Sequence, residues 1–225
     1  MRSRVLVPTL ALAALALSGC KVDLNAAASG APDAPGAGTA APARGVSGDH
    51  AAALAALGAP RPEDTGAHYD RDDWGDWAYD SKSKCDTRES ILVRDGDGET
   101  VDSQCRSACP KEACWTSRYD GVTAKDPHDL QIDHIVPLAE AARSGARDWT
   151  PAQRKQFYND QENLVAVTVR SNTQKSDGDP GKWRPALQTY WCDYVTGYVA
   201  IKTKYKLSVD DNELAGITAM FRSCG

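Results

Sequence analysis

The chain has 225 residues, of which 31 are acidic and 26 are basic, and its formal net charge is −5. A domain that binds nucleic acid is usually basic, so the overall charge argues mildly against that class. The acidic excess is local, however, because residues 49–127 hold 17 acidic and 10 basic side chains whereas residues 128–185 hold 8 of each. The charge alone therefore does not decide the class of protein.

The first twenty residues are typical of an export signal rather than of a folded segment. Arg2 and Arg4 give a basic start, and the apolar run from Val5 to Leu17 is too short to span a bilayer comfortably. The ending Leu-Ser-Gly-Cys resembles a lipobox, which predicts lipidation at Cys20 and a protein anchored at the cell surface or released from it. An ordinary secretory signal is the alternative. No later segment is apolar enough to span a membrane.

A disordered tether is expected over residues 21–58, because residues 21–48 are mostly Ala, Gly and Pro and have little to bury. His50 to Leu57 predicts a short helix where this tether meets the domain. Residues 59–225 have the length and the spread of aromatic and aliphatic residues of one domain. We find no internal repeat.

Six cysteines remain once Cys20 is assigned to the signal: Cys85, Cys105, Cys109, Cys114, Cys192 and Cys224. An even number in an exported domain favours three disulfides. Six cysteines allow fifteen connectivities, among which the sequence suggests only a Cys192–Cys224 bridge that ties down the C-terminus. A zinc site in the middle cluster is the alternative, but this cluster has no CxxC pair and no nearby His.

The first half of the domain predicts short strands. Ser90 to Arg94 is typical of a strand, and Asp-Gly-Asp-Gly at 95–98 predicts a hairpin turn before a second strand at Glu99 to Val101. The same acidic run is also compatible with a calcium loop, although it lacks the distant bidentate Glu of that motif. Further strands are expected at Trp115 to Tyr119 and at Leu130 to Ile132.

Helices dominate the expected elements of the second half. Leu138 to Ala142 predicts a helical turn that ends at Ser144-Gly145, and Thr150-Pro151 predicts a capped helix that runs to about Tyr158. The remaining elements are a strand at Leu164 to Val169, a short helix at Arg170 to Lys175, a long helix at Pro185 to Lys204 and a closing helix at Asp210 to Phe221. The fold class is therefore α+β.

An acid and an imidazole, Asp133 and His134, stand side by side at the end of one predicted strand. A His can accept a proton from water near neutral pH, and a carboxylate can hold a divalent ion that offsets charge on a leaving oxygen. Side chains alternate along a strand, so the two residues would serve separate roles. A DH dipeptide alone is weak support for this chemistry, because structural hydrogen bonds also explain it.

Three motifs in order favour the chemical role over structural hydrogen bonds: DHIVP, then the Asn of QENLVAV, then SNTQKSDGDPGKW. Together they resemble the HNH, or His-Me finger, endonuclease family, and more narrowly the exported bacterial members related to the C-terminal domain of GmrSD restriction endonucleases. The similarity extends to CDTRESILVRD and to YDGVTAKDPHDLQIDHIVPLAEAARSGARDWT, so it covers most of residues 69–224.

The resemblance implies a ββα-metal finger core at about residues 128–185, with extra helices and a hairpin, stapled by disulfides. It implies that His134 is the general base and that Asp133 ligates one divalent metal, Mg²⁺ or else Mn²⁺. Asn163 would hold the loop that positions His134, with a strand-entry cap as the alternative. Asn172 would be a metal ligand at a position where many HNH sites have His, a departure that leaves the metal affinity open.

Two basic residues complete the implied site. Lys175 lies three residues after Asn172, on the same helical face, and would hold the scissile phosphate; Arg88 in CDTRE would be a second phosphate contact. The alternatives are a solvated lysine and an ion pair with nearby carboxylates. Arg170 and Arg184 are expected to contact backbone phosphates or to be plain surface charges.

The expected function is an exported, metal-dependent endonuclease, monomeric, that hydrolyses DNA or RNA with little sequence specificity. The alternative is a non-catalytic, disulfide-stabilised surface lipoprotein that binds the cell wall or a partner. A calcium-binding module, based on the acidic segments 70–80 and 95–99, is a third interpretation.

Overall fold

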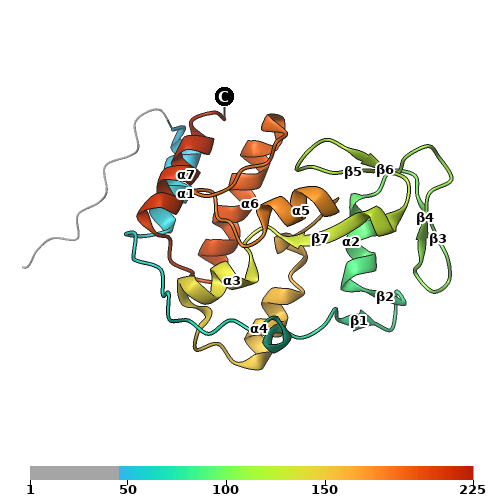
Figure 1. Cartoon of the computed structure of the whole chain (residues 1–225), viewed down its shortest axis with the longest axis horizontal. Coiled ribbons are helices and arrows are strands. Elements are labelled where there is room, and N and C mark those ends of the chain that lie inside the picture. The colour runs from blue at the N-terminus through green and yellow to red at the C-terminus, as the bar shows by residue number, and fades with distance from the viewer. Residues whose placement is uncertain (1–45, 225) are drawn as a thin grey trace, which may run out of the picture. The chain divides into compact units, whose positions relative to one another are not determined.

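The structure, a computed structural model, describes residues 46–224. Cys20, the signal and the first part of the tether lie outside these residues. The described chain is a mixed α+β domain with four separate two-stranded antiparallel ribbons, three of which lie on the side of the domain opposite α1 (Gly48–Ala56), α6 (Trp191–Lys204) and α7 (Asp211–Phe221) (Figure 1). None of the described helices is long and apolar enough to cross a membrane.

One hairpin lies at the centre of the domain. Strand β7 (Leu130–His134) pairs antiparallel with β8 (Leu164–Thr168), and helix α5 (Val169–Lys175) follows β8 directly. Both strands were predicted from their apolar, β-branched runs, and the short helix from its position after them. All three predictions are confirmed.

The long connection between these strands holds two helices. Helix α3 (Leu138–Ala141) runs into a single π-turn over Ala142–Ala146, where Gly145 has a φ of 134° that only glycine adopts readily. Helix α4 (Pro151–Tyr158) begins at a capping box, in which Thr150 and Gln153 exchange side chain to backbone bonds. The break at Gly145 and the cap at Thr150 were both predicted.

Three helices pack together on one side of the central hairpin (Figure 1): α1 (Gly48–Ala56), α6 (Trp191–Lys204) and α7 (Asp211–Phe221). Helix α6 buries Tyr194 and Tyr198 completely. It begins at Trp191 and not at Pro185 as predicted, because Gln188–Tyr190 form a separate 3-10 turn before it. The Cys192–Cys224 disulfide ties the start of α6 to the end of the chain and confirms that predicted pairing. Because α1 contacts α6, the packed part of the chain begins at Gly48, whereas the composition predicts a domain that begins at about Ala59.

Short ribbons and one helix form the other side of the hairpin (Figure 1). The elements are β1 (Tyr79–Asp80) with β2 (Cys85–Asp86), α2 (Thr87–Asp95), β3 (Thr100–Val101) with β4 (Ser107–Ala108), and β5 (Trp115–Thr116) with β6 (Thr123–Ala124). Disulfides Cys85–Cys105 and Cys109–Cys114 stabilise this region, which excludes the zinc alternative for these cysteines.

The strand predicted at Ser90 to Arg94 is wrong, because these residues belong to α2. The Asp86 side chain accepts the backbone N–H of Glu89 and caps this helix, and Ile91 and Leu92 are completely buried on its inner face. The hairpin turn predicted at 95–98 is also wrong: this segment leaves α2, and the turn of the β3–β4 ribbon lies after Val101. The apolar run alone did not distinguish a buried helix from a strand.

Candidate active site

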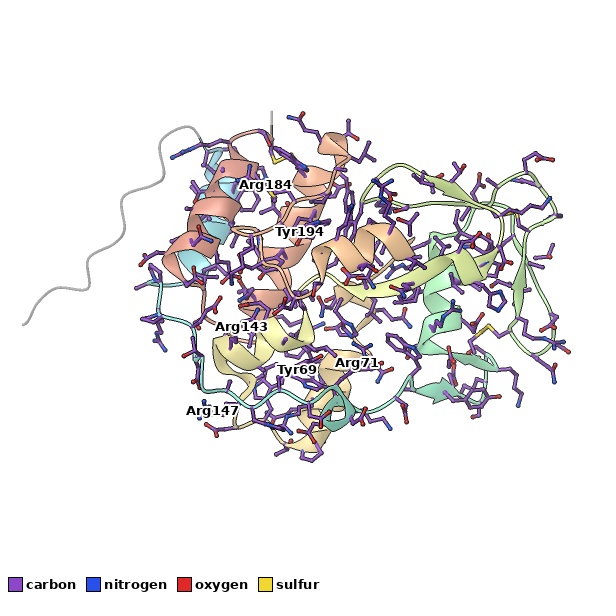
Figure 2. The ribbon with its side chains drawn as sticks, in the orientation of Figure 1. Tyr69, Arg71, Arg143, Arg147, Arg184 and Tyr194 are labelled. Carbon is purple, nitrogen blue, oxygen red and sulfur yellow. A yellow bond between two sulfur atoms is a disulfide. The ribbon has the colours of Figure 1, made fainter. Side chains whose placement is uncertain are left out.

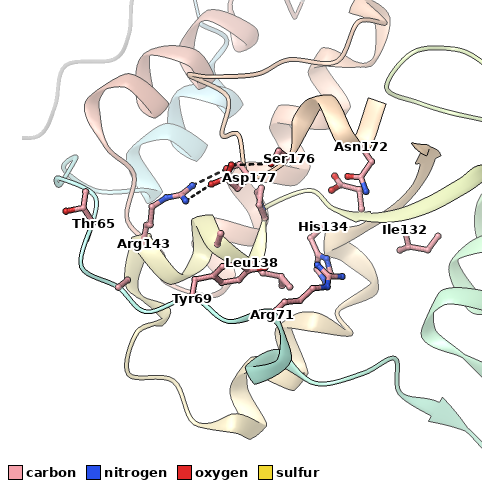
Figure 3. Close-up of a pocket in the computed structure, with 14 residues that line it drawn as sticks. Thr65, Tyr69, Arg71, Ile132, His134, Leu138, Arg143, Asn172, Ser176 and Asp177 are labelled. Carbon is pink, nitrogen blue, oxygen red and sulfur yellow. Dashed lines mark hydrogen bonds and ion pairs between the residues drawn. The ribbon is translucent and has the colours of Figure 1, made fainter. Parts of the chain in front are cut away.

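A cavity of about 570 Å³ opens at the end of β7 (Figure 3). Its walls come from β7, α3, α5 and an N-terminal strap, which we define as residues 59–78 and which includes the 3-10 turn Arg71–Trp74. Asp133, His134 and Asn172 all line this cavity. The central hairpin and the helix that follows it thus bring three of the predicted site residues together.

His134 is almost completely buried and firmly oriented. Its Nε2 lies 2.9 Å from the backbone oxygen of Tyr158, and its ring stacks on Trp77 at a centroid distance of 5.8 Å. Because a carbonyl oxygen can only accept, the proton lies on Nε2 and leaves Nδ1 as an acceptor. Burial, with the charges of Arg71 and Lys175 as smaller causes, lowers the pKa of His134 to about 3 against the opposing hydrogen bond to Tyr158. The imidazole is therefore neutral at pH 7.

Asp133 has partners of its own. Its Oδ2 accepts the hydroxyl of Tyr119 at 2.6 Å and lies 2.9 Å from Nζ of Lys175. Burial and the neighbouring carboxylate raise the pKa of Tyr119 well above its usual value, so the phenol remains a donor. The side chains of Asp133 and His134 thus have separate hydrogen-bond partners.

Lys175 lies under the pair rather than on an exposed face. It is 2% exposed, and its Nζ donates to the backbone oxygen of His134 at 2.8 Å as well as to Asp133. Burial lowers its pKa, and the Asp133 carboxylate opposes that shift. With two protein acceptors, this ammonium supports both members of the DH pair from beneath.

Asn163 holds the chain just after His134. Its Oδ1 accepts the N–H of Val136 at 2.8 Å, its Nδ2 donates to the oxygen of Val136 at 3.2 Å, and its backbone oxygen accepts the N–H of Ile135 at 2.8 Å. The side chain is completely buried. These three bonds fix the turn through which β7 leads into α3.

The donors around the cavity suit a small divalent cation. Asn172 donates its Nδ2 to Gln131 at 2.7 Å, so its carbonyl oxygen Oδ1 remains for another partner. Carboxylate and amide oxygens are ligands that Mg²⁺ accepts, usually with several waters. Asp133 and Asn172 on one cavity wall therefore fit such an ion, although Asp133 would share its charge with Lys175.

The structure places the other predicted cations away from the cavity. Arg88 pairs with Glu89 at 2.8 Å and donates to the backbone oxygen of Pro127 at 3.1 Å. Arg184 lies over the ring of Trp191, well away from the cavity residues Tyr69 and Arg71 (Figure 2). Neither arginine lines the cavity, and Arg170 does not line it either.

Sequence reasoning missed the contribution of the strap. Tyr69 and Arg71 line the cavity, and Trp77 stacks on His134. The sequence offered only the acidic, aromatic run YDRDDWGDW, for which a calcium-binding module was the third interpretation. In the structure Asp70 instead caps the 3-10 turn, and Asp80 accepts bonds from the backbone of Lys82 and Ser83.

One cluster of carboxylates within the described residues has the spacing of a cation site: Glu63, Asp179 and Asp210. Lys182 pairs with Glu63 at 2.6 Å and with Asp179 at 2.8 Å. The lysine ammonium thus already supplies the positive charge there. The acidic segments 70–80 and 95–99 do not form such a cluster.

Comparison with known proteins agrees with the motifs. Residues 93–220, more than half of the chain, match the C-terminal domain of GmrSD restriction endonucleases. An uncharacterized secreted protein of Arthroderma benhamiae is 41% identical over 166 residues, which cover 73% of this chain and 79% of that protein. No solved structure matches the chain. The chain therefore belongs to the family of GmrSD restriction endonuclease C-terminal domains.

Proposed function

We propose that this protein is a metal-dependent endonuclease of the HNH, or His-Me finger, type that hydrolyses phosphodiester bonds in nucleic acid. The observation that carries the proposal is the bond from Nε2 of His134 to the Tyr158 oxygen, because it leaves a neutral Nδ1 acceptor on a cavity that also presents oxygens of Asp133 and Asn172. In this interpretation β7, β8 and α5 are the ββα finger. Family membership supports the assignment.

His134 would accept the proton of the attacking water through Nδ1, within reach of a phosphate held in the cavity. Asp133 and Asn172 would hold the divalent ion, Mg²⁺ or Mn²⁺, which when bound offsets negative charge on the phosphate and on the departing 3′ oxygen. Lys175 holds the Asp133 carboxylate in place. Asn163 keeps the turn after His134 in position.

The substrate would be DNA or RNA, bound mainly through phosphates, so little sequence preference and a fall in activity with rising salt are expected. The secreted relative and three disulfides support export. A signal over residues 1–20, a lipid anchor at Cys20, a tether after it and a monomeric state complete the proposal.

One observation favours a second candidate, a non-catalytic surface protein that keeps the finger as a scaffold. Lys175 already neutralises Asp133, so the site is electrostatically satisfied without an added ion. Such a protein would bind the cell wall or a partner through other surfaces.

The test is cleavage of supercoiled plasmid and of circular single-stranded DNA by the oxidised protein that begins at Lys21, with Mg²⁺ or Mn²⁺. The controls are EDTA and the His134→Ala variant. Cleavage of either substrate that both controls abolish is the expected result. If the folded protein leaves both substrates intact with every divalent ion, the scaffold interpretation replaces the nuclease.

A further inference from the structure

We propose that Tyr69 and Arg71 form a subsite for one nucleotide of a single-stranded nucleic acid, in which Arg71 binds a phosphate and Tyr69 stacks on an unpaired base. This inference rests on the proposed nuclease function and specifies its substrate class. Both residues lie on the strap, before the residues 93–220 that match the family. The family match therefore does not account for them.

Arg71 differs from the other cations at the cavity in that it has no carboxylate partner among the described residues. Arg143 also lines it, but this arginine pairs with Asp177 at 2.8 Å and with Glu140 at 3.1 Å. Lys175 is buried against Asp133. Among residues 46–224, Arg71 has no carboxylate partner within ion-pair distance. Its guanidinium is thus the lining cation that remains available to a phosphate.

The position of Arg71 relative to the base His134 is fixed. Its Nη2 lies 3.3 Å from the hydroxyl of Tyr158, the residue whose backbone oxygen accepts the bond from His134. Arg71 is close enough for its charge to act on the imidazole, and Figure 3 shows its side chain reaching toward His134. A phosphate on Arg71 would therefore lie next to the proton acceptor.

Aromatic packing makes this part of the strap rigid. Trp74, three residues after Arg71, is 2% exposed and packs edge-on against Phe157 and Trp149 at centroid distances of 5.6 and 6.0 Å. Farther along, the N–H of Ala78 donates to Asn159 at 2.8 Å. The end of the turn and the residues after it are thus anchored to α4 and its C-cap, so a nucleotide would meet a preformed wall.

Tyr69 has the features of a stacking platform. It is 40% exposed, although large apolar side chains are usually covered, and it lines the cavity beside Leu138. No described residue stacks on its ring or bonds to its hydroxyl. A free aromatic face next to a phosphate-binding cation is the combination by which proteins hold single strands.

The depth of the reacting groups argues against an intact duplex. His134 and Asp133 are 4% and 6% exposed at the base of a cavity of about 570 Å³. A cavity of this size suits a single small ligand, and a nucleotide is of that order. Bases in a duplex are stacked on one another, so their faces reach an aromatic side chain only when they are unpaired or flipped out.

The experiment measures binding without cleavage. Fluorescence anisotropy of a labelled twelve-nucleotide DNA single strand, and of the matching duplex, is followed with the oxidised protein in EDTA. The variants are Tyr69→Ala, Tyr69→Phe and Arg71→Ala, and the controls are Tyr79→Ala, an exposed tyrosine outside the cavity, and Arg106→Ala, a surface arginine paired with Asp102. Thermal melts verify that every variant is folded.

We expect Tyr69→Ala to weaken single-strand binding about tenfold, because stacking on one base is lost, and Tyr69→Phe to retain it. Arg71→Ala should weaken binding and reduce the slope of log affinity against log salt by about 0.7, the value for one phosphate contact on a single strand. The two controls should bind like the original protein, and Tyr69→Ala should not change duplex binding.

Single-strand binding that is unchanged in Tyr69→Ala and Arg71→Ala overturns the inference. Equal loss of duplex and single-strand affinity, or no binding at all, also overturns it. The cleavage assay judges the nuclease function separately, because the anisotropy measurement needs neither metal nor turnover. A protein that cuts plasmid but ignores these substitutions would keep the proposed function and lose the subsite.

Discussion

Replacing Asn163 with alanine tests whether the turn after His134 depends on one buried side chain. Two of its bonds are made by the amide, which accepts the N–H of Val136 and donates to the oxygen of Val136. The Asn163→Ala variant removes both and gives these backbone groups no replacement, because the site is completely buried and water has no access. The bond from Ile135 to the backbone of residue 163 remains.

The magnitude follows from that count. A buried polar group left without its partner costs about 1–3 kcal/mol, so two such groups cost roughly 2–6 kcal/mol. A domain of this size is stable by about 5–15 kcal/mol, so the variant should fold but be clearly weakened. The matched variant Asn172→Ala loses one bond, to Gln131 on the exposed side of the site, and should cost under about 1 kcal/mol.

Urea unfolding followed by tryptophan fluorescence measures both variants, since Trp74 and Trp77 pack around α4 and His134. Plasmid cleavage under folding conditions gives the complementary result: Asn172→Ala should lose metal-dependent activity while its stability is retained. If Asn163→Ala unfolds within about 1 kcal/mol of the original protein, the two bonds do not hold the turn, and the reasoning about Asn163 fails.

Three further predictions concern stability. Replacing Cys192 and Cys224 with serine opens a loop with a sequence separation of 32 and should cost about 3–4 kcal/mol in denaturant unfolding; an unchanged midpoint would contradict this. Lys175→Met should lower the free energy of unfolding by about 3–5 kcal/mol, because it leaves the Asp133 carboxylate buried without its cation. The double variant with Asp133→Asn should recover part of that stability. A double variant that is less stable than Lys175→Met alone would contradict the role of the ion pair. Burial raises the pKa of Glu213 from 4.5 to about 7, so the folded state keeps a proton that the unfolded state loses between these values, and the contribution of this group to stability should fall as pH rises across that window, by up to roughly 3 kcal/mol. The lowered pKa of His134 contributes with the opposite sign below its usual value of 6.5. Glu213→Gln should therefore make stability rise more steeply with pH than in the original protein in melts from pH 4.5 to 7, and equal slopes in the two proteins would contradict the assignment to Glu213.

Local patterns predicted the elements that form the candidate site. The apolar run of β7, the β-branched run of β8 and the cap at Thr150 each depend on residues that are close in sequence, and the structure contains all three. The α2 segment was misassigned because a buried helix and a buried strand share the same apolar run, and what decided between them was the cap at Asp86. The motifs also predicted that Asp133, His134 and Asn172 belong to one site, and in the structure all three line one cavity.

The environment of these residues was less accessible to sequence reasoning. The motifs predict that Lys175 holds the scissile phosphate, with an exposed lysine as the alternative, but the structure buries it under Asp133 with the backbone oxygen of His134 as a second partner. Tyr119, fourteen residues before Asp133, supplies its hydroxyl to the same carboxylate. No local pattern links these residues, because the contacts depend on how the chain before β7 and the helix after β8 close over the hairpin.

The walls of the cavity therefore come from two segments of the chain with different roles. The groups proposed to cut the bond, between Asp133 and Asn172, come from one contiguous segment, β7 to α5, which we propose to be the finger. The wall that a substrate would meet, at Tyr69 and Arg71, comes from a strap about sixty residues earlier that is anchored by Trp74 against α4. Tyr69, on whose ring no described residue stacks, can change without disturbing His134, whereas Trp77 of the same strap stacks on that imidazole. Substrate choice in this protein should accordingly depend on the strap, and the chemistry on the finger.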